Sequence, residues 1–160
     1  MAHKALTIRG VKPLCKYQHK FDNLYLFGAF SPITGNHLLL EMPSCNTDCF
    51  QVFLNELSNS DKGEFKILLL DNGAFHKAQR LVIPPNIALI FLPPYSPELN
   101  PAEKIWWTIK RNLKNQLFKT IEDLSEAITK SIQLLISNTS VKSITSYQYY
   151  CKAFWTTFNA

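Results

Sequence analysis

The sequence lacks the features that mark several large classes of protein. No apolar run approaches the roughly 18 residues that a membrane-spanning helix needs, and no signal-peptide pattern is present. Of the four cysteines, Cys45 and Cys49 have no second ligand pair at zinc-like spacing. Only 18% of the residues are charged and 46% are hydrophobic, which excludes a disordered chain. We therefore expect a cytoplasmic protein with reduced thiols and no membrane partner.

Acidic residues are missing from the first 20 positions, where all the charged side chains are basic: Lys4, Arg9, Lys12, Lys16 and Lys20. A second basic group follows Glu103 and consists of Lys104, Lys110, Arg111, Lys114 and Lys119. The chain as a whole carries a formal charge of +5. Such clusters are typical of proteins that bind a phosphate-bearing partner. The solvated surface of a mildly basic protein is the alternative explanation.

The strands can be predicted from runs of apolar and aromatic residues. Residues 23–30 and 37–42 are expected to pair as a β-hairpin around the turn at 31–35, where Pro32 and Gly35 set the backbone. Residues 65–70 and 87–92 are continuous apolar runs, which are typical of strands buried on both faces. With the helices between them, these strands predict an α/β fold in which helices flank a mixed sheet.

Four helical segments follow from capping residues and apolar spacing. Asn46 or Thr47 can cap the first helix, and a short helix is expected over residues 75–81. A long helix is predicted from Asn100 to about Phe118, and another begins at Thr120, where Asp123 completes a capping box. The apolar stripes of the three longer helices comprise Phe50, Phe53, Leu54 and Leu57; Ile105, Ile109, Leu113 and Leu117; and Leu124, Ile128, Leu135 and Ile136. Residues 119–160 are expected to form a helical extension whose aromatic tail packs onto another surface.

Two carboxylates stand where predicted elements end or begin. Asp71 follows an apolar strand and precedes the turn formers Asn72 and Gly73, while Glu103 lies in the first turn of the long helix. Carboxylates on a strand end and a helix N-terminus can hold Mg²⁺ or Mn²⁺ for phosphodiester chemistry if the two elements are neighbours. Simpler roles remain open: Asp71 as a turn residue, Glu103 as a capping-box glutamate and His76 as a structural histidine.

The string Asp71-Asn-Gly-Ala-Phe-His76-Lys, followed by Leu92-Pro-Pro-Tyr-Ser-Pro-Glu-Leu-Asn-Pro-Ala-Glu103, resembles the signature of bacterial insertion-sequence transposases related to the mariner group. These belong to the DDE transposase and integrase superfamily, and the resemblance extends over roughly residues 9–118. It implies a ribonuclease-H-like fold, Mg²⁺- or Mn²⁺-dependent nicking at transposon ends, and attack of the freed 3′ hydroxyl on target DNA. By this resemblance Asp71 and Glu103 match the last two acids of the catalytic, metal-binding triad. The DNA contacts that we expect come from His76, Lys104, Trp107, Lys110, Arg111 and Lys114.

The sequence departs from the family pattern at the first acid of the triad. In the family this acid lies on a strand upstream of the segment that matches Arg9-Gly-Val-Lys-Pro13, and none of the eight residues before Arg9 is acidic. Asp22 comes after that segment. The spacing of 31 residues between Asp71 and Glu103 is also slightly shorter than usual. We therefore expect residues 1–160 to be one N-terminally truncated catalytic domain that lacks the first strand and the first Asp.

Three hypotheses about function follow. In the first, the chain is a transposase core that binds double-stranded DNA as a homodimer and whose two remaining acids hold metal too weakly to complete the reaction. In the second, it is a non-catalytic DNA-binding remnant that uses the basic face of helix 100–118. In the third, the upstream residues are encoded in an overlapping frame. The nucleotide sequence before Met1 would separate the third hypothesis from the first two.

Overall fold

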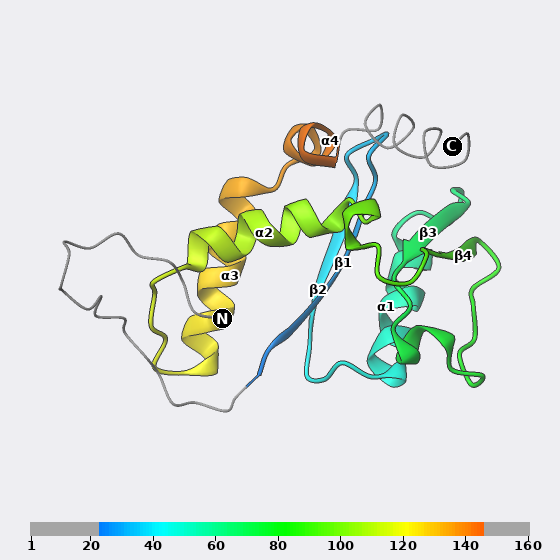
Figure 1. Cartoon of the computed structure of the whole chain (residues 1–160), viewed down its shortest axis with the longest axis horizontal. Coiled ribbons are helices and arrows are strands. Elements are labelled where there is room, and N and C mark those ends of the chain that lie inside the picture. Colours follow the sequence, from blue (N-terminus) through cyan, green and yellow to red (C-terminus); the bar gives the residue numbers. More distant parts are fainter. Residues whose placement is uncertain (1–22, 146–160) are drawn as a thin grey trace.

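The structure is a computed structural model, and it describes residues 23–145 (Figure 1). The predictions for the basic N-terminal segment and for the aromatic tail after Thr145 lie outside the described residues. Along the described residues, two strands precede a helix, two further strands follow it, and three helices come after them, which is a mixed α/β arrangement as predicted. None of the helices in residues 23–145 has both the length and the apolar character needed to cross a bilayer.

The predicted hairpin is confirmed. Strands β1 (Tyr25–Phe30) and β2 (His37–Met42) pair antiparallel, with Tyr25 opposite Met42 and Phe30 opposite His37. Gly35 closes the turn with a φ of +79°, a conformation that glycine adopts without steric cost. The neighbouring chain also leaves no room for a side chain at this position, because a Cβ at Gly35 would lie 2.0 Å from the carbonyl oxygen of Asn138. The hairpin tip is therefore packed tightly against the start of α4 (Asn138–Thr145).

Helix α1 (Thr47–Ser60) forms one layer of the fold. The Asn46 side chain caps it by accepting a hydrogen bond from the N–H of Cys49 at 2.9 Å, as predicted. The predicted apolar stripe of Phe50, Phe53, Leu54 and Leu57 is buried. Side chains from both strand pairs pack against this stripe, namely Tyr25, Phe27, Ala29, Leu38 and Leu40 from β1 and β2, and Leu68, Leu70 and Leu89 from β3 and β4. One helix thus holds two pairs of strands together (Figure 1).

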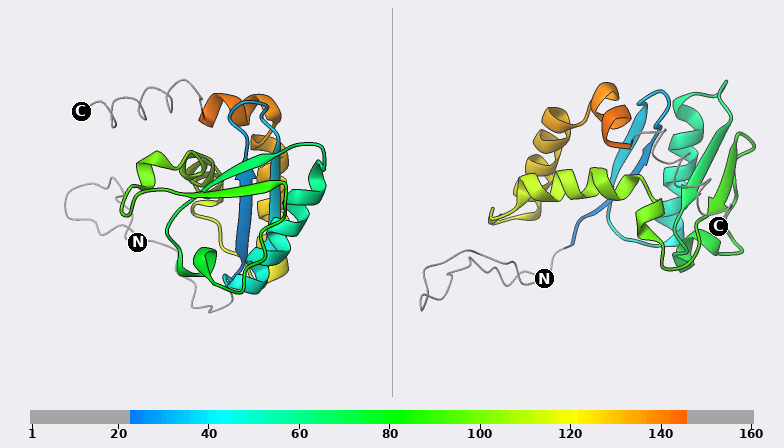
Figure 2. Two further views of the ribbon diagram at one scale, coloured as in Figure 1. Left: turned by 90° about the vertical axis from the view of Figure 1, so that its right-hand side faces the viewer. Right: turned by 45° about the horizontal axis from the view of Figure 1, so that its top comes forward.

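Strands β3 (Lys66–Leu70) and β4 (Ile87–Phe91) pair in parallel. The prediction that both are buried on two faces was wrong for the described residues: Ile67 is 63% exposed, Leu69 44% and Ile90 48%. Side chains alternate across a strand, so α1 covers only one set of them and no described element covers the other. The expected single mixed sheet is also not formed in residues 23–145, where the strands make two separate pairs that run in different directions (Figure 2).

Helices α2 (Ala102–Leu113), α3 (Ile121–Leu135) and α4 (Asn138–Thr145) surround a second core. Ile105 and Ile109 from α2 meet Ile136 and Val141 there, and side chains of β1 and β2 such as Leu39 complete it. The capping box between Thr120 and Asp123 is present as predicted. This second core attaches α2 to the hairpin and so places the start of α2 next to the end of β3.

Two helix boundaries differ from the predictions. Helix α2 ends at Leu113 instead of Phe118: Lys114 is already extended, with ψ 139°, and Asn115 follows in a left-handed conformation with φ +65°, which asparagine tolerates better than most residues. Leu117 lies beyond the helix and is 49% exposed, so its assignment to the core face was wrong. The helix expected over residues 75–81 is a 3-10 turn, η1 (Ala74–Lys77), followed by irregular chain.

Candidate active site

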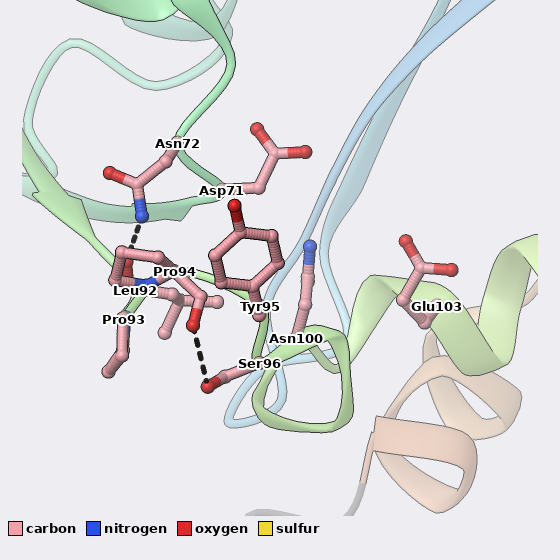
Figure 3. A pocket seen from close by; sticks show the side chains of 9 residues that line it. All are labelled: Asp71, Asn72, Leu92, Pro93, Pro94, Tyr95, Ser96, Asn100 and Glu103. Atoms are coloured by element: carbon pink, nitrogen blue, oxygen red, sulfur yellow. Dashed lines mark hydrogen bonds between the residues drawn. The ribbon is translucent and has the colours of Figure 1, made fainter.

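The two carboxylates singled out by the sequence line one small pocket of about 140 Å³ (Figure 3). Asp71 and Asn72 reach it from the end of β3, and Glu103 reaches it from the first turn of α2. The loop between β4 and α2 forms the rest of the wall with Leu92, Pro93, Pro94, Tyr95, Ser96 and Asn100. The structure therefore brings together two acids that 31 residues separate in the sequence.

Asp71 is held at the carboxyl ends of the two parallel strands. The N–H of Leu92 donates to the carbonyl of Leu70 at 2.8 Å, which extends the β3–β4 pairing by one residue. The side chain of Asn72 donates from Nδ2 to the Leu92 carbonyl and accepts from Nζ of Lys77 through Oδ1. These bonds tie the turn after β3 to the loop after β4, so the backbone that carries the Asp71 carboxylate is fixed relative to the pocket.

The Asp71 side chain is 70% exposed, and its two hydrogen-bond partners in the described chain both contact Oδ1. The N–H of Gly73 donates to this oxygen at 3.1 Å, which is the turn interaction expected of an Asp-Asn-Gly sequence. The Nδ1 atom of His76 lies 3.0 Å from the same oxygen. Asp71 thus does act as a turn residue. The two contacts to Oδ1 orient its carboxylate and leave most of it exposed.

His76 lies behind Asp71, away from solvent. Its side chain is 10% exposed, and its ring packs on Phe50 and Phe75 at centroid distances of 4.5 and 4.0 Å. Burial lowers the pKa of His76 and outweighs the opposing effect of the Asp71 charge. A neutral ring at pH 7 can donate its Nδ1–H to Asp71. This burial favours a role in positioning Asp71 over the DNA contact that the sequence suggested for His76.

Cys45 is a neighbour of Asp71 that the sequence did not single out for this site. Its pKa is raised by partial burial, by the negative charge of Asp71 and by Cys49. The thiol of Cys45 is therefore harder to ionise than an ordinary cysteine, and it does not line the pocket. The atoms of the pocket that could ligate a metal are its oxygen atoms.

Glu103 is placed by the cap and the packing of α2. The Asn100 side chain accepts from the N–H of Ala102 at 3.1 Å, and its carbonyl accepts from the N–H of Glu103 at 3.1 Å. Asn100 therefore caps the helix, as the sequence predicted. It lies one residue before Pro101, the residue that directly precedes the first residue of α2. The carboxylate of Glu103 lies across the pocket from Asp71 (Figure 3). In the described chain it makes no capping-box bond back to Asn100, which leaves it available to a ligand.

Oxygen donors of this kind suit Mg²⁺ or Mn²⁺, since hard divalent cations prefer carboxylate, carbonyl and water oxygens. Asp71 and Glu103 are the acidic residues at the pocket. Across residues 23–145, however, no three His, Cys, Asp or Glu side chains come together in a group that could hold a metal ion. The pocket thus contains two carboxylates that could bind a divalent cation, and the other ligands would have to come from substrate, solvent or other residues.

The exposed side of α2 continues from the pocket as a face rich in cations. Glu103, Trp107 and Arg111 are spaced four residues apart and so lie along one side of the helix. Trp107 is 60% exposed, and the guanidinium carbon of Arg111 lies 4.5 Å from its ring centroid. Lys110 is exposed beside this pair, as are Lys104 and Lys114. Four of the residues predicted to contact DNA are therefore exposed on the helix that carries Glu103, and the fifth, Lys114, directly follows its last turn.

Tyr95 is a pocket residue to which the sequence analysis assigned no role in the site. Tyr95 has a φ of +59°, and its side chain is 101% exposed. The neighbouring residues in the sequence could have pointed to it, because this tyrosine follows Pro93 and Pro94 and precedes Ser96 and Pro97. Prolines restrict both their own backbone and that of the preceding residue, so a loop of this composition is stiff.

Comparisons with known proteins agree with these observations. A family described as DDE superfamily endonuclease matches residues 2–125, a range that includes Asp71 and Glu103. An uncharacterized protein of Sinorhizobium fredii (strain NBRC 101917 / NGR234), y4pE/y4sA, is 42% identical over 102 residues. That similarity covers 62% of this chain and 76% of the relative.

Proposed function

The chain belongs to the DDE superfamily endonuclease family, and we propose that it acts in DNA transposition, in metal-dependent DNA cleavage and strand transfer. The observation that carries this proposal is the presence of Asp71 and Glu103 in one pocket. Within the family we assign the chain to the bacterial insertion-sequence transposases related to mariner elements. The Leu92-to-Glu103 string supports this assignment. The parallel β3–β4 pair under α1 supports a ribonuclease-H-like fold.

Asp71 and Glu103 are the proposed catalytic residues, and both would hold Mg²⁺ or Mn²⁺. A divalent cation at such a site stabilises the charge that develops on a phosphodiester as it is cleaved. His76 positions the Asp71 carboxylate through its Nδ1 atom and keeps one oxygen turned toward the protein. Asn72 fixes the strand end that carries Asp71, and the Asn100 cap fixes the helix turn that carries Glu103.

Double-stranded DNA, from transposon ends and target, is the proposed substrate. The side of α2 that carries Lys104, Trp107, Lys110, Arg111 and Lys114 would bind the phosphate backbone next to the pocket. In this arrangement the lysine and arginine side chains contact the DNA on either side of the phosphate that faces Asp71 and Glu103. We propose a homodimer as the functional complex, since transposition joins two transposon ends.

A second candidate is a DNA-binding protein without catalytic activity. In residues 23–145 no third His, Cys, Asp or Glu joins Asp71 and Glu103 in a group that could hold a metal ion, and this favours the non-catalytic candidate. In this case the basic side of α2 would bind DNA, and the two carboxylates would contribute little.

Titration with Mn²⁺, followed by electron paramagnetic resonance, tests the metal site. The full chain should bind Mn²⁺ weakly, and Asp71→Asn and Glu103→Gln should each abolish this binding. Glu98→Gln is the matched control, because Glu98 is exposed in the same loop but does not line the pocket. Equal Mn²⁺ binding by all four proteins would contradict the proposed site.

A nicking assay on supercoiled plasmid DNA with Mg²⁺ or Mn²⁺ separates the two candidate functions. Since two carboxylates should hold the ion weakly, we expect no nicking by this chain alone. Nicking that disappears in Asp71→Asn would show that the two acids suffice for catalysis. DNA binding in the absence of any Mn²⁺ binding would favour the non-catalytic candidate.

A further inference from the structure

Tyr95 combines a disfavoured backbone conformation with complete exposure of its side chain. Its φ of +59° lies in the left-handed region, where a bulky L-residue is an outlier. Its side chain is 101% exposed, so the ring gains no packing energy in return. Strain that persists without a structural benefit is most often found at binding and catalytic sites.

The loop around Tyr95 maintains this conformation. Pro93 and Pro94 restrict the chain before it, and the hydroxyl of Ser96 donates to the Pro94 carbonyl at 3.4 Å. The N–H of Leu99 donates to the Ser96 carbonyl at 3.1 Å, which continues the loop into a 3-10 turn, η2 (Pro97–Leu99). A rigid support of this kind fixes the backbone that carries the Tyr95 side chain before any ligand arrives.

That place is the carboxylate pocket. Tyr95 lines it together with Asp71, Asn100 and Glu103, and Figure 3 shows its ring among these side chains. A phosphodiester that faces Asp71 and Glu103 through a divalent cation would bring its own nucleotide toward this ring. The ring is flat and solvent-exposed, as in side chains that stack on nucleobases.

We propose that Tyr95 stacks on an unpaired nucleobase of the strand whose phosphate faces Asp71 and Glu103. The inference rests on the proposed function, since it takes DNA as the substrate. Both faces of a base inside a duplex are covered by its neighbours, so the base that Tyr95 receives must be unpaired or displaced at that position. Tyr95 then makes the protein prefer DNA whose base pairs are locally open, and the lysine and arginine side chains of α2 bind the flanking phosphate backbone.

Fluorescence anisotropy with two labelled oligonucleotides tests this assignment. Both have one sequence, and they differ only in whether the last few bases at one end are paired or unpaired. The full wild-type chain should prefer the unpaired form by roughly tenfold, the effect of stacking one base on an aromatic ring. Tyr95→Phe should keep this preference, because the ring remains. Tyr95→Asn should lose the preference, because the ring is removed.

The same variants show whether Tyr95 has a structural role instead. Asparagine tolerates the left-handed conformation, so Tyr95→Asn should unfold at the same temperature as the wild type or higher. A lower unfolding temperature, a preference retained in Tyr95→Asn, or a preference lost in Tyr95→Phe would each overturn the stacking role. Equal wild-type binding to both oligonucleotides would overturn it while leaving DNA binding intact. No binding to either would contradict the proposed function itself.

Discussion

Trp106 packs against the backbone of Gly28 so closely that a Cβ at Gly28 would lie 2.7 Å from Cη2 of the indole. The same indole meets the ring of Phe30 edge to face at a centroid distance of 5.4 Å. These contacts attach α2 to strand β1. Glu103 lies one turn earlier on the same helix, so this packing helps to decide where its carboxylate stands relative to Asp71.

Gly28→Ala should therefore destabilise the protein and displace α2. The added methyl group would also lie 2.9 Å from Leu39, so overpacking should lower the free energy of unfolding by about 1–3 kcal/mol. Urea denaturation measures this change. Mn²⁺ titration of the folded variant should show weaker binding than in the wild type, because Glu103 moves with the helix.

Gly63→Ala is the matched control for this substitution. A Cβ at Gly63 would lie 3.5 Å from the Asp61 carboxylate, which is an ordinary contact. Its free energy of unfolding should stay within about 1 kcal/mol of the wild-type value, since alanine also restricts the unfolded chain. If Gly28→Ala were as stable as Gly63→Ala, tight packing of Trp106 would not be what holds α2.

His76 should make stability depend on pH below its ordinary pKa. Burial lowers the pKa of His76 in the folded protein from its usual 6.5, so the unfolded chain takes up a proton that the folded protein does not. The stability that comes from keeping His76 neutral is complete above about pH 6.5 and is lost as the pH falls below it. Thermal unfolding of wild type and His76→Gln at pH 7.5 and 5.5 should show the larger loss on acidification in the wild type. Parallel losses would mean that His76 does not titrate differently in the two states.

Thr120→Ala and Thr129→Ala should have opposite effects on α3. Thr120 caps this helix through its hydroxyl, which accepts from the N–H of Asp123 at 3.1 Å, so its removal should cost about 1 kcal/mol. Thr129 is an exposed residue in the middle of the same helix, where alanine is the better helix former by a few tenths of a kcal/mol. Urea denaturation should give a lower free energy of unfolding than that of the wild type for Thr120→Ala and a higher one for Thr129→Ala. Similar free energies for both would argue against the capping role.

Lys110→Ala should weaken DNA binding more at low salt than at high salt. Each phosphate contact releases condensed counterions, so the loss of one should reduce the slope of log affinity against log salt by about 1. Lys130→Ala on α3 is the control, because Lys130 pairs with Glu126 at 3.1 Å and lies on another helix. Anisotropy measured over a series of NaCl concentrations gives both slopes. An unchanged slope for Lys110→Ala would exclude this lysine from the DNA-binding surface.

Much of the local structure could be predicted because its determinants lie close together in the chain. Asn46 and Thr120 cap helices through residues three positions away, and the hairpin depends on a turn between adjacent strands. The α1 stripe could be predicted from helical spacing alone. The end of α2 was mistaken because the apolar spacing continues to Leu117, whereas the backbone is already extended at Lys114 and left-handed at Asn115.

The candidates for the site could be identified from the sequence: an acid after an apolar strand, an acid in the first turn of a helix, and a motif that joins them. The sequence could not predict that Asp71 and Glu103 line the same pocket, that His76 is buried against Asp71, or that Tyr95 is exposed beside them. These relationships depend on two contacts between segments that are distant in the chain. Pairing of β3 with β4 sets the position of Asp71, and packing of Trp106 on Gly28 sets that of Glu103.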